Sequence, residues 1–517
     1  MPVAHVDWIA LIIFVLLFGF ITWLGFAAAR WRRGDLNLLH EWGLGGRRFG
    51  TIVTWFLVGG DLYTAYSFIA VPALAFGAGA TAFFAIPFTI VSYPFLFLFF
   101  PRLWNVCRKR GYITAADFVR GRFGNRWLAL AVTITGIVAT MPYIALQLVG
   151  IQVVVGALGI SGSGLAADLP LIVAFIVLAA FTYSSGLRAP ASIAIVKDVL
   201  IFFTAIYAIV LLPIKLGGFA KIFAQVPVQK ILLAAPSAHS TGAYGAYATL
   251  ALGSSFAVFL YPHAFTAIIS ASSGKAIRRN AVMLQGYSIT LGVLALFGFF
   301  AIAAHLDQLP EFARGFRQFG NNFAVPALLL HSFPSWFVGI AFAAIGIGAL
   351  VPAAIMSIAA ASLYTRNIHK EFINRKPTDL QESQMAKWVS LVVKLGALAF
   401  ILFVPTQYAI QLQLLGGIWI VQTVPAIMLG ACTAWFNSWA LLIGWAVGTL
   451  VGTTMAVAAH LTPAYPLVVG GYTFPGYTAF YTLLLNLAVT IVLTLIFNAI
   501  GARSASLDET LASDYQA

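Results

Sequence analysis

Long apolar stretches recur along the entire chain, and they constrain its fold more than any other feature. A helix needs about 20 predominantly apolar residues to cross the hydrocarbon core of a bilayer. Of the 517 residues, 61% are hydrophobic and only 9% are charged, whereas an ordinary soluble domain has about 25% charged residues. Lipid cannot satisfy backbone polar groups, so runs of this length are expected to be helical. The sequence therefore predicts an all-α polytopic membrane protein.

Thirteen membrane-spanning helices are predicted from the apolar runs between polar breaks. The first run is longer than the core of a signal peptide and follows no Lys or Arg, so we expect it to be a retained span. The predicted spans are 8–29, 51–79, 81–106, 127–158, 170–186, 190–213, 246–272, 280–304, 325–364, 386–404, 407–432, 437–459 and 475–500.

The basic residues predict the orientation in the membrane. One set of alternate loops, together with the C-terminal tail, holds 22 of the 29 Lys and Arg residues. Because cytoplasmic loops are enriched in Lys and Arg, the N-terminus is expected outside and the C-terminus in the cytoplasm. This topology also explains the net charge of +14, and no nucleic-acid motif accompanies it. The expected surroundings are the bilayer and its anionic head groups, with no nucleic acid and no obligate protein partner.

Two predicted spans contain residues that break helices. In the second span the glycines at 59–60 precede Asp61, and in the seventh span the small residues at 253–255 are followed by Pro262 and His263. Paired breaks in two halves indicate a transporter binding site, because unwound backbone offers carbonyls and amides to an ion or a substrate. The alternative is that Gly and Pro are simply common in membrane helices. On the first interpretation, spans two to six and seven to eleven are two five-helix repeats.

The expected organisation has four parts. These are a first span with its cytoplasmic loop (1–50), a transporter core (51–432) with repeats at about 51–213 and 246–432, two peripheral spans (433–500) and a cytoplasmic tail (501–517).

Four further motifs are "EWGLGGRRFG" (41–50), "GYITAADFVRGRFGN" (111–125), "SSGLRAPASIAIVKD" (184–198) and "YPHAFTAIISAS" (261–272). These motifs resemble those of the sodium:solute symporter family. The resemblance implies the inverted-repeat fold of the leucine transporter. Within the family, "GGDLYTAYSFIAVPAL" (59–74) is most similar to bacterial monocarboxylate permeases of the lactate, pyruvate and alanine type. A multi-pass protein of the bacterial inner membrane is therefore implied.

The resemblance also implies a coupling-ion site. Family members that use sodium bind it through backbone carbonyls of the second and ninth spans and through two ninth-span hydroxyls. The carbonyls correspond to Gly60, Tyr63 and Gly348. The hydroxyl positions carry Val351 and Pro352, which have no hydroxyl. A hard cation needs about six oxygen ligands, so this loss slightly favours a proton over sodium. No other cofactor and no confident metal site is expected.

Asp61 is the principal candidate for coupling. A carboxylate inside the membrane costs about 2.5–3.5 kcal/mol on insertion scales, and such residues are usually functional. Asp61 could bind the coupled proton, or it could be a charged ligand of a sodium ion. It could also be a structural carboxylate that accepts amides of the unwound segment.

Polar residues near the breaks are candidate substrate ligands. A small carboxylate is bound by hydroxyl and amide donors and by helix N-termini. Tyr143 and Gln147 stand four residues apart, so they share one face of the fourth span. The alternative for each side chain is an interhelical hydrogen bond. The predicted substrate-binding residues are Thr64, Tyr66, Ser67, Tyr143, Gln147, Tyr261 and His263.

A few further residues have predicted roles. Lys197 and Asp198, near the start of the sixth span, are interpreted as a cytoplasmic-side gate or a structural ion pair. His263 is either a proton relay or a residue that orders the helix break, and the Pro-His pair of the resembling family favours the structural role. A stripe of glycines at 444, 448 and 452 predicts close helix packing within the chain, with a dimer contact as the alternative.

The most favoured function is a secondary active symporter that imports a small monocarboxylate with a cation. A sodium-coupled amino-acid importer of the same fold and a transporter-like membrane sensor are the alternatives. The sequence contains no HExxH, GxSxG or Walker motif, so neither enzymatic catalysis nor ATP-driven pumping is expected.

Overall fold

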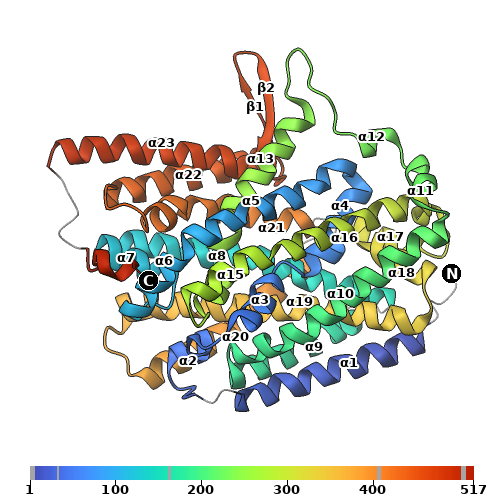
Figure 1. Cartoon of the computed structure of the whole chain (residues 1–517), viewed down its shortest axis with the longest axis horizontal. Helices are drawn as coiled ribbons and strands as arrows, with labels where there is room; N and C mark the ends of the chain where they lie inside the picture. The colour runs from blue at the N-terminus through green and yellow to red at the C-terminus, as the bar shows by residue number, and fades with distance from the viewer. Residues whose placement is uncertain (1–5, 32–33, 161–164, 404–408, 502–507, 517) are drawn as a thin grey trace.

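Long helices that lie side by side form nearly all of the structure (Figure 1). The computed structural model describes residues 6–31, 34–160, 165–403, 409–501 and 508–516. Up to the end of the sixth span the helices are α1 (Trp8–Ala27), α2 (Leu39–Leu44), α3 (Thr51–Gly59), α4 (Val71–Ala78), α5 (Ala85–Leu98), α6 (Phe100–Arg110), α7 (Ala115–Phe123), α8 (Arg126–Ala157), α9 (Leu165–Ser185) and α10 (Arg188–Leu216).

The part of the chain after the sixth span also consists mainly of helices. After the short helices α11 (Phe219–Gln225) and α12 (Val228–Ile231) come α13 (Gly242–Ala257), α14 (Pro262–Ile269), α15 (Gly274–Met283), α16 (Gln285–Ala303), α17 (Ala313–Phe319), α18 (Ala324–Ser332), α19 (Ser335–Tyr364), α20 (Asp379–Phe403), α21 (Ala409–Ile420), α22 (Ser438–Ala458) and α23 (Thr478–Ala499).

The helices account for the thirteen predicted spans. Nine segments of the described chain are long and apolar enough to cross a membrane, and one of them, Tyr66–Leu98, includes both α4 and α5. Shorter apolar segments are Leu169–Ser185 in α9 and Gln413–Leu429, which begins in α21. The two predicted spans that remain are the second, in which α3 precedes the break, and the tenth, which is α20. The ninth span is shorter than predicted, because Pro334 separates the short α18 from α19.

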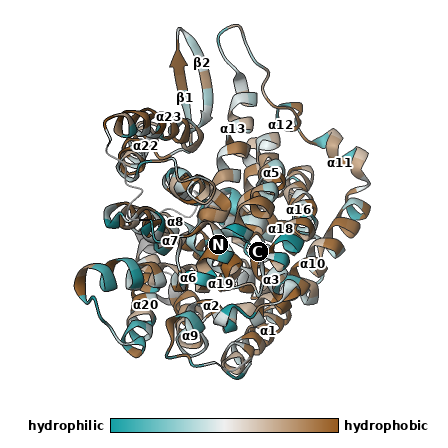
Figure 2. Cartoon of the chain, turned by 60° about the vertical axis from the view of Figure 1, so that its left-hand side comes forward, coloured by the Kyte–Doolittle hydropathy of each residue, from teal (hydrophilic) through white to brown (hydrophobic). Residues whose placement is uncertain are grey.

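Helix α19 lies at the centre of the bundle. It packs against α1, α8, α10 and α20, and nearly all of its residues are buried. Helices α1, α22 and α23 lie at the periphery, and they are predominantly hydrophobic in Figure 2. Their outward side chains, such as Leu16 at 67% exposure and Leu450 at 68%, are apolar because they face lipid rather than water.

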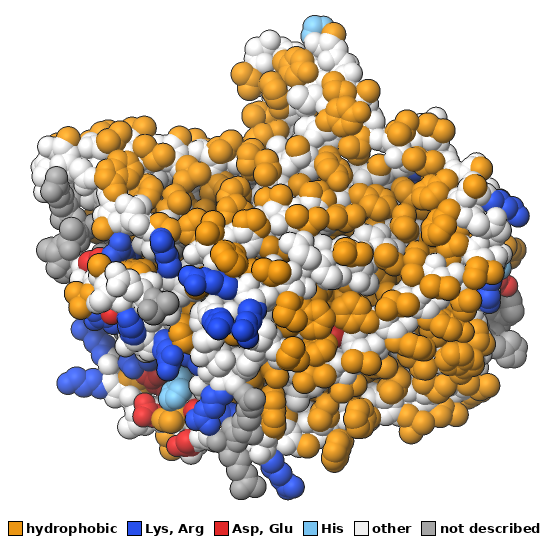
Figure 3. All heavy atoms as spheres, in the orientation of Figure 1, with side chains coloured by type: hydrophobic (Ala, Val, Ile, Leu, Met, Phe, Trp, Pro, Cys, Tyr) orange, Lys and Arg blue, Asp and Glu red, His pale blue; other side chains and the backbone are white. Residues whose placement is uncertain are grey.

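Charge is concentrated at one end of the bundle. Figure 3 shows Lys and Arg side chains gathered at the left, over the region of α6 and α7, while hydrophobic side chains cover most of the remaining face. The C-terminal residues 508–516 lie at this end, where Arg110 pairs with Asp514 at 2.6 Å and Arg122 pairs with Asp508 at 2.5 Å.

A β-hairpin between α22 and α23 was not predicted. Strands β1 (Ala464–Val469) and β2 (Tyr472–Tyr477) pair antiparallel, so the predicted helix start at residue 475 is wrong and α23 begins at Thr478. The turn residues Gly470 and Gly471 have φ values of 58° and 80°. A two-residue turn with two positive φ angles favours glycine and matches the twist of a hairpin. The Gly-Gly pair between aromatic and β-branched residues was the available signal.

The break in the seventh span occupies only the later part of the predicted one. Residues 253–255 are inside α13, where Gly253 allows close packing: a Cβ there would lie 2.6 Å from the Tyr477 ring. The helix instead tightens at 258–260 and restarts at Pro262. Proline is favoured in the first turn of a helix, where its missing N–H costs nothing.

The predicted glycine stripe in the twelfth span packs within the chain. Added Cβ atoms at 444, 448 and 452 would meet Thr490, Gln422 and Ile418 at 2.1–2.8 Å. The small residues therefore let α22 approach α23 and the helix α21 segment closely.

Candidate functional site

The second span is interrupted where two glycines meet other helices. Helix α3 ends at Gly59, and a π-helical turn begins at Tyr66. A Cβ at Gly59 would lie 2.2 Å from the ring of Tyr287, and one at Gly60 would lie 2.8 Å from Lys197 Nζ. Only glycine permits such close approach, so the Gly-Gly pair brings the unwound backbone onto α10 and α16.

The exposed carbonyls of this segment are bound by a lysine. Lys197 Nζ donates to the carbonyl oxygens of Gly60 and Tyr63, the second at 2.8 Å. The ammonium also lies 2.8 Å from Asp198 Oδ1, and both side chains are fully buried. These are two of the three carbonyls that the resemblance assigned to the coupling ion. Gly348 is adjacent, since a Cβ on it would lie 3.8 Å from the Tyr63 carbonyl oxygen.

Tyrosines complete the surroundings of this ion pair. The Tyr287 hydroxyl donates to Asp198 Oδ2 at 2.7 Å, and the Tyr63 hydroxyl donates to the Tyr287 carbonyl at 3.0 Å. The rings of Tyr63 and Tyr287 lie 4.5 Å apart, and both contact Phe202. The side chain of Tyr63 is therefore held in a packed aromatic cluster on the α10 and α16 side.

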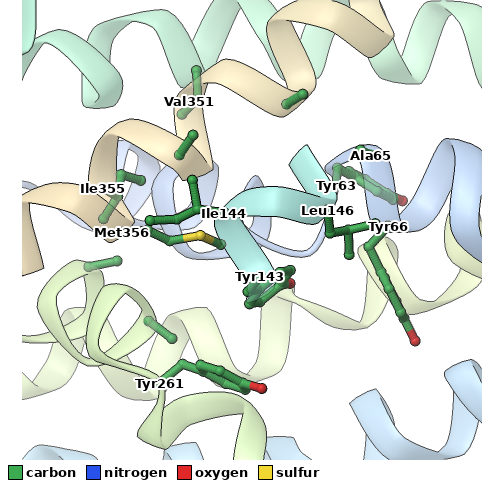
Figure 4. Close-up of a cluster of buried hydrophobic side chains, with 14 of the residues drawn as sticks. Tyr63, Ala65, Tyr66, Tyr143, Ile144, Leu146, Tyr261, Val351, Ile355 and Met356 are labelled. Atoms are coloured by element: carbon green, nitrogen blue, oxygen red, sulfur yellow. The ribbon is translucent and has the colours of Figure 1, made fainter. Parts of the chain in front are cut away.

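The ninth-span hydroxyl positions are filled by apolar side chains. Val351 and Pro352 are buried within α19, and Figure 4 shows Val351 on that helix. The nearest serine along the helix, Ser357, donates to the Ala354 carbonyl at 2.8 Å and lies 3.2 Å from the Ser390 hydroxyl.

Asp61 contacts a histidine from the other broken span. Asp61 Oδ2 lies 3.2 Å from His263 Nε2, and both side chains are buried. His263 is in the first turn of α14. Among the described residues, Asp61 Oδ1, His263 Nδ1 and the hydroxyl of Tyr66 have no hydrogen-bond partner. The two breaks therefore meet at a buried acid–imidazole pair whose outer polar atoms can bind a further group.

Aromatic rings surround this pair. The ring of Tyr143 lies 5.1 Å from that of His263 and 5.3 Å from that of Tyr261. In Figure 4, Tyr143 from α8 lies between Tyr261 and Tyr66, which belong to the two breaks. The hydroxyl of Tyr261 donates to the Gln413 carbonyl at 2.8 Å and so ties this wall to α21.

Three other predicted substrate ligands hydrogen-bond to the unwound segment itself. Gln147 Oε1 accepts from the Ala65 amide at 3.2 Å, and Thr64 Oγ1 accepts from the Tyr66 amide at 3.0 Å. The Ser67 hydroxyl donates to the Leu62 carbonyl. These contacts stabilise the break and satisfy backbone groups that a helix would otherwise pair.

The structure thus forms two adjacent polar clusters. One joins Asp61 and His263, and the other joins Lys197, Asp198 and Tyr287. Sequence reasoning missed Tyr287, because its partner Asp198 is 89 residues away and no motif surrounds it. Within the described ranges, no three His, Cys, Asp or Glu side chains gather as metal ligands.

Comparisons with known proteins agree with this architecture. The model of the sodium:solute symporter family matches residues 42–436. The "Monocarboxylate transport permease protein" of Rhizobium johnstonii is 50% identical over 95% of this chain and 97% of its own length. The "Uncharacterized symporter YodF" of Bacillus subtilis is 32% identical over 94% of this chain and 93% of its own.

A solved structure matches the fold. A sodium-coupled sialic acid symporter in a substrate-bound, outward-open state has a TM-score of 0.74 over 95% of this chain and 98% of its own, at 15% identity. The expected inverted-repeat architecture is thereby confirmed, and the protein is a multi-pass membrane transporter rather than an enzyme. The chain belongs to the sodium:solute symporter family.

Proposed function

We propose that this symporter imports a short monocarboxylate of the pyruvate and lactate class across the bacterial inner membrane, together with a proton. The substrate class is supported by the relative named a monocarboxylate transport permease, with which the chain shares 50% identity along nearly its full length. The observation that carries the coupling is the buried contact of Asp61 with His263 where the two broken spans meet.

The site has donors for one carboxylate group. The first turn of α14 directs backbone N–H groups and the positive end of its dipole toward the break, and His263 lies in that turn. The Tyr66 hydroxyl can donate to a carboxylate oxygen, and His263 Nδ1 can do so when the Asp61–His263 pair holds a proton. Their aromatic neighbours Tyr143 and Tyr261 leave an apolar surface for a short carbon chain. Larger polar substrates would bury hydroxyls without partners, which is costly.

Charge couples the proton to the substrate. With Asp61 ionised, a substrate carboxylate at the same buried site would be strongly repelled, because charges interact strongly in a low-dielectric interior. A proton held by Asp61 and His263 removes this repulsion. The protonated transporter therefore binds the anion, and substrate and proton are released together on the cytoplasmic side.

Uptake by the purified protein in proteoliposomes tests the proposal. Labelled pyruvate should accumulate under an imposed inward proton gradient in sodium-free buffer, and a protonophore should abolish the accumulation. Lactate should compete with pyruvate, whereas glucose should not. Uptake of labelled alanine or proline without uptake of pyruvate would replace the substrate by an amino acid. Accumulation that requires sodium and ignores the pH gradient would overturn the proton assignment.

A further inference from the structure

Lys197 lies at the carbonyls that the family resemblance assigned to a coupling cation. Its ammonium contacts the carbonyl oxygens of Gly60 and Tyr63, and it pairs with Asp198 Oδ1 at 2.8 Å. An ammonium has three N–H donors, and this site offers three acceptors, two carbonyls and one carboxylate. The two carbonyls accept hydrogen bonds, and the carboxylate forms an ion pair, so the buried charge is compensated.

The groups facing the ammonium come from three elements. Asp198 is on α10 itself, Tyr63 belongs to the broken span, and Tyr287 of α16 binds the second carboxylate oxygen at 2.7 Å. Asp61 is the further carboxylate whose charge interacts with Lys197. The Lys197 ammonium thus neutralises the Asp198 carboxylate, which it contacts directly, and it also contacts two carbonyl oxygens. Oxygens of these kinds also bind monovalent cations, but here the cation belongs to a side chain.

Several features of the site disfavour a second cation beside the ammonium. A Cβ added at Gly60 would already lie 2.8 Å from both Lys197 Nζ and Asp198 Oδ2. A sodium ion would need further oxygens, but the adjacent ninth-span positions are Val351 and Pro352, both buried and without hydroxyls. Sodium next to the ammonium would also be repelled by its charge.

We infer that the Lys197 ammonium is the permanent cation of this site, that it joins the unwound second span to α10, and that it makes the transporter independent of sodium. The uptake test of this inference rests on the proposed function, whereas the thermal-unfolding test does not. The tethered charge replaces a diffusible ion, so the proton at Asp61 and His263 is the only cation that has to be transported with the substrate.

Two substitutions separate this role from a simple packing role. Lys197→Ala removes the ammonium and leaves a cavity lined by the three acceptors, whereas Lys197→Met removes the charge but keeps the side-chain volume. In sodium-free buffer both variants should lose at least about tenfold in uptake rate, equivalent to 1.4 kcal/mol. Added sodium or propylammonium should restore a large part of uptake to Lys197→Ala and little to Lys197→Met, because methionine fills the space.

Thermal unfolding in detergent gives a readout that does not depend on the substrate. At constant ionic strength, the wild-type melting temperature should be the same in sodium and in choline, whereas Lys197→Ala should be stabilised by sodium in a saturable manner. A sodium-dependent wild type, or a folded Lys197→Ala that neither loses uptake nor responds to added cations, would overturn the inference. If Lys197→Ala cannot be purified, the wild-type melting temperature in sodium and in choline still tests the inference, because stabilisation by sodium would overturn it. Failure of wild-type pyruvate uptake would instead contradict the proposed function.

Discussion

Asp61 combines two properties that are rarely found together in a membrane helix. It is buried, and one of its oxygens contacts His263 while the other has no partner among the described residues. A buried carboxylate that only stabilised the break would be expected to have both oxygens hydrogen-bonded. The free oxygen therefore favours a group that changes its protonation or its ligand during transport.

Replacing Asp61 by Asn should uncouple transport. Asparagine keeps the size and the hydrogen bond to His263 but cannot release a proton. Uphill pyruvate accumulation in proteoliposomes should fall to the background level, while exchange of internal for external pyruvate should be retained, because the site stays neutral and still accepts the anion.

Asp61→Glu is the matched control, since it keeps the titratable group, and it should retain partial accumulation. Normal accumulation by Asp61→Asn would show that the proton is carried elsewhere.

Gly60 is required by the close approach of Lys197 and Asp198. In Gly60→Ala the added Cβ would lie 2.3 Å from the Phe56 carbonyl oxygen and 2.8 Å from the ion pair. Overpacking of this kind costs about 1–3 kcal/mol, and it should also displace the ammonium from its carbonyl ligands. We expect a lower melting temperature and at least about tenfold slower uptake.

Gly396→Ala in α20 is the comparison, because nothing lies within 4 Å of a Cβ there. It should be neutral or stabilising by up to about 1 kcal/mol. Equal effects of the two substitutions would show that the tight contact at Gly60 is unimportant.

At the scale of elements, the C-terminal segment is anchored to α6 and α7. The Glu509 amide donates to the Gly121 carbonyl at 2.8 Å, and Arg122 lies over the ring of Tyr515. Asp514 accepts from the Leu511 amide and pairs with Arg110, and these contacts lower the pKa of Asp514 below its ordinary value. The segment thus covers the ends of these two helices by a small set of polar contacts.

Asp514→Asn should release this segment. A carboxyl group whose pKa is lowered in the docked state stabilises docking above its ordinary pKa of about 4 and loses that contribution as the pH falls through the lowered value. In the wild type, residues 508–516 should therefore stay docked between about pH 5 and pH 8. In Asp514→Asn, the backbone amides of this segment should exchange hydrogen faster than in the wild type at the same pH. Ser513→Ala is a suitable control, because only the backbone carbonyl of Ser513 contacts Lys109. Equal exchange in Asp514→Asn and wild type would contradict the anchoring role.

The sequence predicted that two spans are broken, but it predicted the position of only one break correctly. The glycines at 59–60 predicted the first break correctly, since α3 ends at Gly59. The predicted second break ran from residues 253–255 to Pro262 and His263, and its first part is wrong, because these residues lie inside α13, where a Cβ at Gly253 would meet Tyr477. Small residues allow either unwinding or close packing, and only the position of the neighbouring helix distinguishes these outcomes.

At the scale of the whole molecule, orientation is still an expectation from the distribution of Lys and Arg. Figure 3 shows the basic side chains concentrated at one end, which should be the cytoplasmic end. In a variant with Cys107 and Cys432 replaced, a cysteine at Ala238 should react with an impermeant reagent in intact cells. A cysteine at Lys376 should react only after lysis. The reverse pattern would invert the topology.

The sequence by itself determined the number of spans, the presence of a broken second span and the family. These properties depend on local composition: apolar length, glycine pairs and motifs within short windows. The buried acid Asp61 was also evident, because one carboxylate in a long apolar run is unusual whatever its neighbours are.

Only the tertiary structure decided which groups contact one another at the site. It brought Asp61 to His263, and it brought the ammonium of Lys197 to carbonyls 134 and 137 residues away in the chain. The sequence had suggested a gate or an ion pair for Lys197, because its charge and its place in a span were visible and the acceptors were not. Hydrogen bonds and ion pairs act over about 3–4 Å, so they depend on how helices pack and not on separation along the chain.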